Sequence, residues 1–157
     1  MAQGMPPNKQ AAPPVRFDGK TVIITGSGAG LGRVYALMYA RLGANLVIND
    51  VNAKGANAVV DEIKQGVSFL VVQDAIEGVT ILCLTAGGKA VAAIASAENG
   101  DAIVKIALDT FGGVHVLVAN AGNLRDKSFS AMSEKEWDDV IAVHLRFVIT
   151  PCIIICK

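Results

Sequence analysis

The sequence has no excess of charge of either sign. Its 157 residues include 14 Lys and Arg and 14 Asp and Glu, which gives a formal net charge of zero. A surface for nucleic acid or for an anionic membrane needs a basic excess, so we expect neither nucleic acid nor a membrane as a partner. The expected partner is a small-molecule ligand.

Cysteines are also few, and long uninterrupted apolar runs are absent. Cys83, Cys152 and Cys156 form neither a disulfide framework nor a metal-binding spacing, so we expect no metal site and a reducing compartment. The longest apolar candidate, 66–86, is interrupted by Gln, Asp and Glu, which argues against a membrane span. Residues 1–14 lack an apolar segment and are predicted to be a flexible arm, not a signal peptide or anchor.

Apolar residues are abundant: they make up 52% of the chain, and charged residues only 18%. This balance favours one domain built on a mostly buried parallel sheet. Apolar runs with helical or strand periodicity alternate along the chain. The predicted strands cover 21–25, 45–49, 90–94 and 114–119, and the predicted helices cover 31–42, 52–65, 99–111 and the stretch that follows the capping box of Ser133 and Glu136.

The glycine-rich stretch 25–32, Thr-Gly-Ser-Gly-Ala-Gly-Leu-Gly, joins the first strand to the first helix. Gly26 can make the tight turn, Gly30 can let the backbone approach a pyrophosphate, and Gly32 can let the helix pack closely. Asp50 ends the next apolar run, where a ribose-binding carboxylate belongs. The pattern predicts a dinucleotide cradle in an α/β fold of Rossmann type. A glycine loop without a ligand is the alternative.

The inward faces of the helices follow from their periodicity. For the first helix we predict an inward face of Leu31, Tyr35, Met38 and Leu42, followed by a left-handed cap at Gly43. For the helix at 52–65 the predicted face is Ala56, Val59, Val60 and Ile63, and for the helix at 99–111 it is Ile103, Ile106, Ala107 and Thr110. For the helix after the capping box it is Trp137, Val140, Ile141, His144, Leu145 and Val148.

Two segments, 66–86 and 147–157, break the alternation, and they hold all three cysteines. Removing the first joins Gln65 directly to Gly87 and restores a normal helix, glycine stop and strand. Our hypothesis is that both segments are translated introns, one an insert and one an aberrant apolar tail. A genuine surface-loop insertion is the alternative for the first. Residues 15–146 are then predicted to form the dinucleotide-binding domain, with the insert 66–86 inside it.

The motifs resemble those of the short-chain dehydrogenase/reductase family. Residues 25–32 match its Thr-Gly-x-x-x-Gly-x-Gly motif, and 119–122, Ala-Asn-Ala-Gly, resemble its Asn-Asn-Ala-Gly. Segments 47–50, 123–129 and 143–146 are similar to the (3R)-hydroxyacyl-CoA dehydrogenase domains of peroxisomal multifunctional enzymes of type 2, above all the fungal forms. The resemblance implies a doubly wound parallel sheet with α/β/α layers, of which this chain carries the N-terminal part, about four strands.

The resemblance also implies NAD as the cofactor. Asp50, without Arg or Lys beside it, would hold the adenosine ribose and disfavour the 2′-phosphate of NADP. Ala95 stands where the family usually has the Asp that binds the adenine amino group. The residues implied to bind NAD are Gly26, Ser27, Gly30, Leu31, Gly32, Asp50, Asn120, Ala121 and Gly122.

The catalytic residues implied by the family are mostly absent from this sequence. His144 stands at the position of the family's active-site Asn, with a satisfied core histidine as the alternative reading. The family's proton-transferring Tyr precedes a Lys by four residues, whereas Tyr35 and Tyr39 are the only tyrosines here and neither has such a Lys. We therefore expect a catalytically incomplete chain.

The implied reaction is NAD-dependent oxidation of (3R)-3-hydroxyacyl-CoA in peroxisomal fatty-acid β-oxidation. The alternatives are a non-catalytic nucleotide-binding fragment, an interaction protein, and a different short-chain reductase such as a 3-oxoacyl reductase. Family members are usually homo-oligomers. The final residues, Ile-Cys-Lys, do not match a peroxisomal Ser-Lys-Leu signal, so the location expected otherwise is the cytoplasm.

Overall fold

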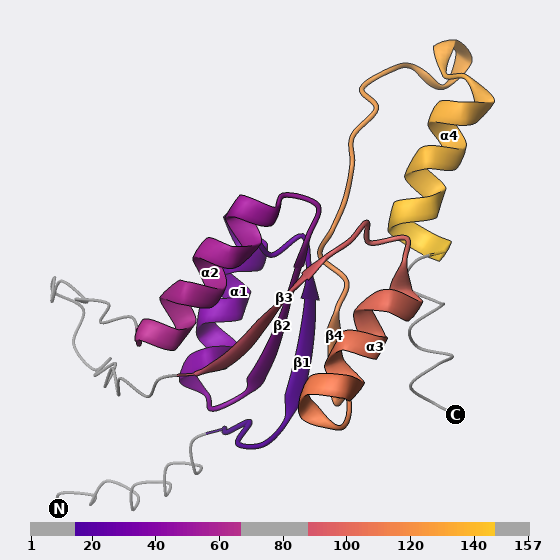
Figure 1. Cartoon of the computed structure of the whole chain (residues 1–157). Coiled ribbons are helices and arrows are strands. Elements are labelled where there is room, and N and C mark those ends of the chain that lie inside the picture. The colour runs from indigo at the N-terminus through magenta and orange to yellow at the C-terminus, as the bar shows by residue number, and fades with distance from the viewer. Residues whose placement is uncertain (1–14, 67–87, 147–157) are drawn as a thin grey trace, which may run out of the picture.

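A four-stranded parallel sheet forms the centre of the molecule (Figure 1). The structure is a computed structural model that describes residues 15–66 and 88–146. Our predictions for 1–14, for the insert and for 147–157 lie outside these residues, apart from Gly66. The strands are β1 (Thr21–Thr25), β2 (Asn45–Asp50), β3 (Lys89–Ile94) and β4 (Val116–Val118), in the spatial order β3-β2-β1-β4. This order confirms the predicted Rossmann-type fold.

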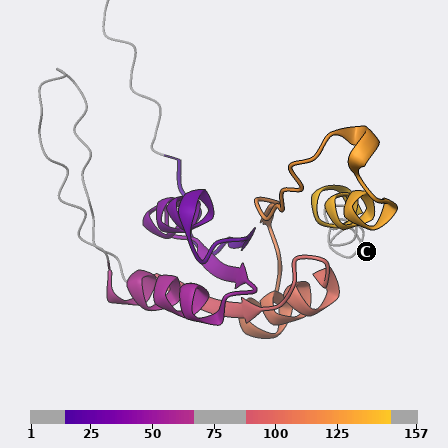
Figure 2. The same ribbon diagram turned by 90° about the horizontal axis from the view of Figure 1, so that it is seen from above.

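Helices cover both faces of the sheet, as Figure 2 shows from above. Helices α1 (Gly30–Arg41) and α2 (Ala53–Gln65) pack on one face, against side chains such as Ile24 and Ile48. Helix α3 (Gly100–Phe111) packs on the other, against Ile23 and Val47. Successive residues of β1 and β2 therefore face opposite cores, which explains why these strands are continuously apolar.

Local capping determines where the helices begin and end. The side chains of Asn52 and Asn99 accept the backbone N–H groups three residues further on, each at 3.3 Å, at the N-termini of α2 and α3. Gly43 after α1 and Gly112 after α3 have positive φ angles of 91° and 77°, which glycine adopts without strain. The cap predicted at Gly43 is confirmed.

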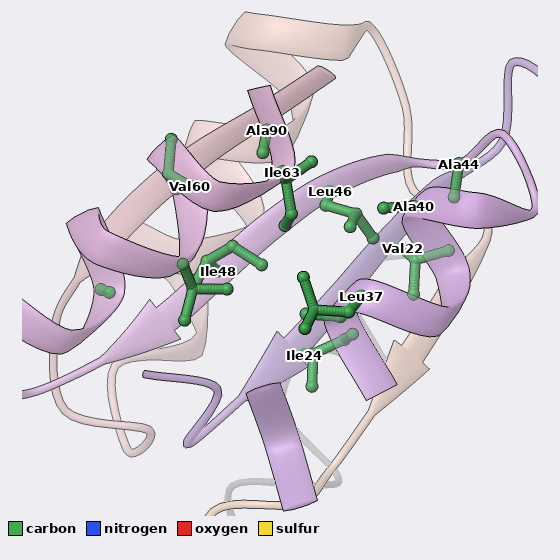
Figure 3. Close-up of a cluster of buried hydrophobic side chains, with 13 residues drawn as sticks. Val22, Ile24, Leu37, Ala40, Ala44, Leu46, Ile48, Val60, Ile63 and Ala90 are labelled. Carbon is green, nitrogen blue, oxygen red and sulfur yellow. The ribbon is translucent and has the colours of Figure 1, made fainter. Parts of the chain in front are cut away.

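The inward face predicted for α1 is confirmed at Tyr35, which is partly buried and packs against the core, and is wrong at Leu31 and Met38. Leu31 and Met38 are exposed, and the buried residues are instead Gly32, Ala36, Leu37 and Ala40. Small residues four apart let the helix axis approach the sheet, so the larger side chains are displaced to its flanks. Figure 3 shows Leu37 and Ala40 within this core.

The inward face predicted for α2 is confirmed, since all four of its residues are buried. The face predicted for α3 is confirmed at Ile103 and Ala107. At the end of that face, however, Thr110 is exposed, and Val104 is buried in addition.

The last described elements lie beyond the carboxyl edge of the sheet. A short 3₁₀ turn, η1 (Phe129–Ala131), precedes α4 (Glu134–Ile141), which continues into the π-helical turn η2 (Ala142–Arg146). The predicted capping box at the start of α4 is present. No residue of α4 is buried, and Figures 1 and 2 show the helix projecting away from the sheet. The apolar face predicted for this helix is therefore not packed on the sheet.

Over residues 15–66 and 88–146, no helix has both the length and the apolar character needed to cross a bilayer.

Candidate functional site

The glycine turn between β1 and α1 is held in a conformation that its glycines permit. Gly26 and Gly30 have φ angles of 61° and 54°, where side chains other than hydrogen are disfavoured. A Cβ on Gly26 would lie 3.0 Å from the Cα of Ala121, and one on Gly32 would overlap the carbonyl oxygen of Gly26. Apart from its chain neighbours and the backbone of its own helix, no atom of residues 15–66 and 88–146 lies within 4 Å of a Cβ built on Gly30, so the turn leaves open space there.

The N-terminus of α1 receives no side-chain cap. Its N-cap residue, Ala29, has no side chain that can accept a hydrogen bond. The first-turn N–H groups of a helix need acceptors, and the positive end of the helix dipole favours a negative group there. The beginning of α1 is therefore suited to an anionic ligand such as a pyrophosphate.

Asp50, at the end of β2, is oriented by two backbone amides. Its Oδ2 accepts the N–H of Gly28 at 2.9 Å, and its Oδ1 accepts the N–H of Asn52 at 2.9 Å. A Cβ on Gly28 would lie 2.9 Å from Oδ2, so only glycine fits between the turn and this carboxylate. Our sequence analysis did not select Gly28, which stands at one of the unspecified positions of the Thr-Gly-x-x-x-Gly-x-Gly motif.

Asn49 is a second residue that the sequence analysis missed. Its buried side-chain amide donates to the carbonyl oxygens of Ala93 at 2.8 Å and Ala95 at 2.9 Å. Its own carbonyl accepts the N–H of Ser27 at 2.9 Å. One residue thus connects the glycine turn, the end of β2 and the loop after β3. The available signal was a polar residue inside an apolar strand, directly before the carboxylate.

Ser27 is fully buried, and its hydroxyl donates to the carbonyl oxygen of Ile24 at 2.7 Å. Its side chain therefore stabilises the turn from inside. Leu31, by contrast, is 66% exposed at the start of α1.

Asn120 fastens the end of β4 to the glycine turn. Its Nδ2 donates to the carbonyl oxygens of Thr25 at 2.9 Å and Gly26 at 3.1 Å. In return, the Thr25 hydroxyl accepts the N–H groups of Asn120 at 3.1 Å and Ala121 at 3.0 Å. These bonds join segments about 95 positions apart in the sequence, at the point where the winding of the sheet reverses. Ligands of doubly wound folds bind at this point.

A cavity of about 260 Å³ opens at this edge of the sheet. It brings together four of the predicted residues, Gly26, Asp50, Ala121 and Gly122. Ala95 also lines the cavity, so a methyl group occupies the wall position where the resemblance implies a carboxylate. Asn123 and, from η2, Val143 complete the wall nearest to α4.

His144 is exposed and lies outside both apolar cores, so the alternative reading of a core histidine is wrong. Its Nε2 is 2.9 Å from the carbonyl oxygen and 3.1 Å from the amide nitrogen of Asn123. The ring tautomer decides which of the two contacts is a hydrogen bond. The residue thus contacts the backbone of the loop that follows β4.

Comparison with known proteins identifies the family. The profile of the short chain dehydrogenases matches residues 20–80 and 89–156. The chain is 44% identical over 135 residues to peroxisomal multifunctional enzyme type 2 of Mus musculus, which covers 86% of this chain. It is 45% identical over 132 residues to the peroxisomal hydratase-dehydrogenase-epimerase of Neurospora crassa, which covers 84% of this chain. The chain belongs to the short-chain dehydrogenase family.

Solved structures of the family have the same architecture. A short chain dehydrogenase from Mycobacterium avium superposes with a TM-score of 0.69 at 36% identity; the match covers 86% of this chain and 44% of the Mycobacterium avium chain. A 7α-hydroxysteroid dehydrogenase in complex with NADH superposes with a TM-score of 0.72 at 30% identity, over 90% of this chain and 48% of its own. The chain spans about half of these structures, and 17% and 12% of the mouse and Neurospora relatives.

Proposed function

We propose that this chain is the NAD-binding part of a dehydrogenase that acts on (3R)-3-hydroxyacyl-CoA. The main support is the hydrogen bond that the Gly28 N–H donates to the Asp50 carboxylate. This pair lies at the edge of the cavity that the glycine turn and the residues after β4 also line. A carboxylate in this position can accept both hydroxyl groups of an adenosine ribose. The similarity to peroxisomal multifunctional enzymes supports a peroxisomal location. The resemblance of residues 47–50, 123–129 and 143–146 to (3R)-hydroxyacyl-CoA dehydrogenase domains supports the substrate.

The charge at Asp50 favours NAD over NADP. The 2′-phosphate of NADP would lie next to the carboxylate, at the position of the ribose 2′-hydroxyl, and the two negative charges would repel each other. The guanidinium of Arg33, in the first turn of α1, is paired with Glu62 of α2. It is therefore committed to an ion pair between helices and does not neutralise Asp50.

When bound, NAD supplies a hydride acceptor at its nicotinamide ring. This chain's own residues would bind and orient the cofactor. The glycine turn and the first N–H groups of α1 would hold the pyrophosphate, and Asp50 would hold the adenosine ribose. Gly122 and Val143 would form the wall of the cavity beside the adenine base. Removing the substrate's hydroxyl proton requires a further group. The two tyrosines, Tyr35 and Tyr39, lie in α1 and pack against the apolar core, away from the cavity.

The position of these tyrosines favours a second candidate function, nucleotide binding without catalysis by the 157-residue chain. An assay of NADH absorbance with NAD and a 3-hydroxyacyl-CoA distinguishes the two. We expect no turnover. Measurable turnover would show that a proton-transferring group other than a family tyrosine operates in this chain.

Cofactor binding is tested by isothermal titration calorimetry with NAD and NADP. We expect saturable NAD binding and weaker NADP binding. The variant Asp50→Asn is nearly isosteric and removes the charge, so it should weaken NAD binding and narrow the difference between the cofactors. The matched control is Asp61→Asn on the exposed side of α2, which should change neither affinity. Lack of saturation at millimolar NAD would contradict the proposal.

A further inference from the structure

Gly122 and the imidazole ring of His144 compete for the same space at the wall of the cavity. A Cβ built on Gly122 would lie 2.7 Å from Cε1 and 3.3 Å from Nε2 of His144. Nonbonded carbon atoms prefer separations of about 3.5–4.0 Å. The ring therefore lies over Gly122, in the volume where any other residue would place its side chain.

The backbone of Asn123 holds the ring in this place. Both its carbonyl oxygen and its amide nitrogen are within hydrogen-bonding distance of Nε2, so either neutral tautomer of the ring finds a partner. The side chain of Asn123 makes a second attachment, from Nδ2 to the carbonyl oxygen of Asp139 in α4 at 3.2 Å. Asn123 thus fastens the loop after β4 to η2 through its main chain and to α4 through its side chain. Further along the loop, Arg125 and Lys127 form ion pairs with Asp139 and Glu136 of α4.

These attachments form one side of the cavity. Gly122 and Asn123 line it together with Val143, the residue before His144. Because no residue of α4 or η2 is buried, apolar packing does little to hold this wall in place. Polar contacts hold it instead, and among them those of Asn123 and His144 are the ones beside the cavity.

We propose that His144 is a positioning residue of the dinucleotide site: its ring locks the Gly122–Asn123 backbone to η2, and residue 122 is glycine because the ring needs the room. His144 then acts through Asn123 and transfers no proton to or from the substrate. This inference rests on the proposed function, since NAD is the ligand whose binding surface is positioned.

A double-mutant cycle on the full chain tests the lock, with NAD affinity measured by calorimetry. His144→Ala should weaken NAD binding about three- to tenfold, the effect of losing one hydrogen bond. Gly122→Ala should weaken it at least as much in the unmodified chain, but less than about twofold in the His144→Ala background, because the clash with the ring is gone. His144→Gln places an amide near the position of Nε2 and should restore affinity to within about twofold.

Two outcomes would overturn the inference. One is an equal effect of Gly122→Ala with and without the ring, and the other is unchanged NAD affinity in His144→Ala. A chain that binds no NAD at all contradicts the proposed function instead. The lock is then still tested by the same cycle on thermal unfolding without ligand, where the steric conflict again predicts non-additive shifts in melting temperature, and additive shifts refute it.

Discussion

The two ends of the segment between α2 and β3 meet at a single carbonyl group, and this predicts the effect of deleting the segment. The N–H groups of Gly66 and Gly88 both donate to the carbonyl oxygen of Ile63, at 3.3 Å and 3.1 Å. Deleting residues 67–87 places Gly66 and Gly88 next to each other. The resulting sequence is the same as that obtained by removing 66–86, the insert predicted from the sequence.

The expected gain in stability follows from loop closure. The entropic cost of closing a flexible loop rises by about 0.6 kcal/mol for each doubling of its length. Shortening the connection from about twenty residues to a turn of two removes about three doublings, which corresponds to about 2 kcal/mol. For a domain of this size the melting temperature should rise by about 4–8 °C.

Calorimetric or circular-dichroism melting of both chains measures the shift, and titration shows whether NAD affinity changes. We expect affinity to be preserved, since Gly66 and Gly88 lie at the amino edge of the parallel sheet and the cavity lies at its carboxyl edge. In the control, residues 67–87 are replaced by a Gly/Ser segment of equal length, and this variant should have the same melting temperature as the unmodified chain. A deletion variant that melts at a lower temperature would refute the reasoning, because the segment would then contribute contacts of its own.

Three further predictions concern single residues. Asn49→Leu removes two buried hydrogen bonds, to the carbonyl groups of Ala93 and Ala95, although Ala93 keeps the N–H of Ala95 as a donor. The variant should therefore lower the free energy of unfolding by about 2–4 kcal/mol in chemical denaturation. Gly28→Ala forces a Cβ against Asp50 and should weaken NAD binding at least tenfold by calorimetry. Hydrogen bonds from Lys127 and then Ser133 lower the pKa of Glu136 from 4.5 to about 2. Its contribution to α4 is therefore fully present above pH 4.5 and lost as the pH falls through about 2, which an NMR titration of its carboxyl carbon checks; a midpoint near 4.5 would contradict these contacts.

The strands and the outline of the site were predictable because each depends on local pattern. Buried parallel strands are runs of branched apolar residues, and a glycine motif between such a run and a helix has few other uses. Asp50 and Asn120 follow from their places at the ends of β2 and β4, and the structure brings both to the glycine turn.

The remaining features depend on distances that local pattern does not contain. The inward face of α1 is set by how closely its small residues let the helix approach the sheet, so Leu31 and Met38 are exposed despite their hydrophobicity. The role of Asn49 follows from its register opposite Ala93 in β3. The π-helical turn at His144 changes the helical period partway along an apolar stripe, and no residue pattern marked it.

The bonds between Thr25, Asn120 and Ala121 have a consequence for the measured affinity of a ligand. β4 is three residues long and pairs with β1 only at the edge of the described sheet, whereas β1, β2 and β3 share an extensive core with their helices. The cavity wall at Ala121 and Gly122 exists only after β4 has docked. A dinucleotide that requires this wall stabilises the docked strand by mass action, so its measured affinity includes the free energy of docking β4.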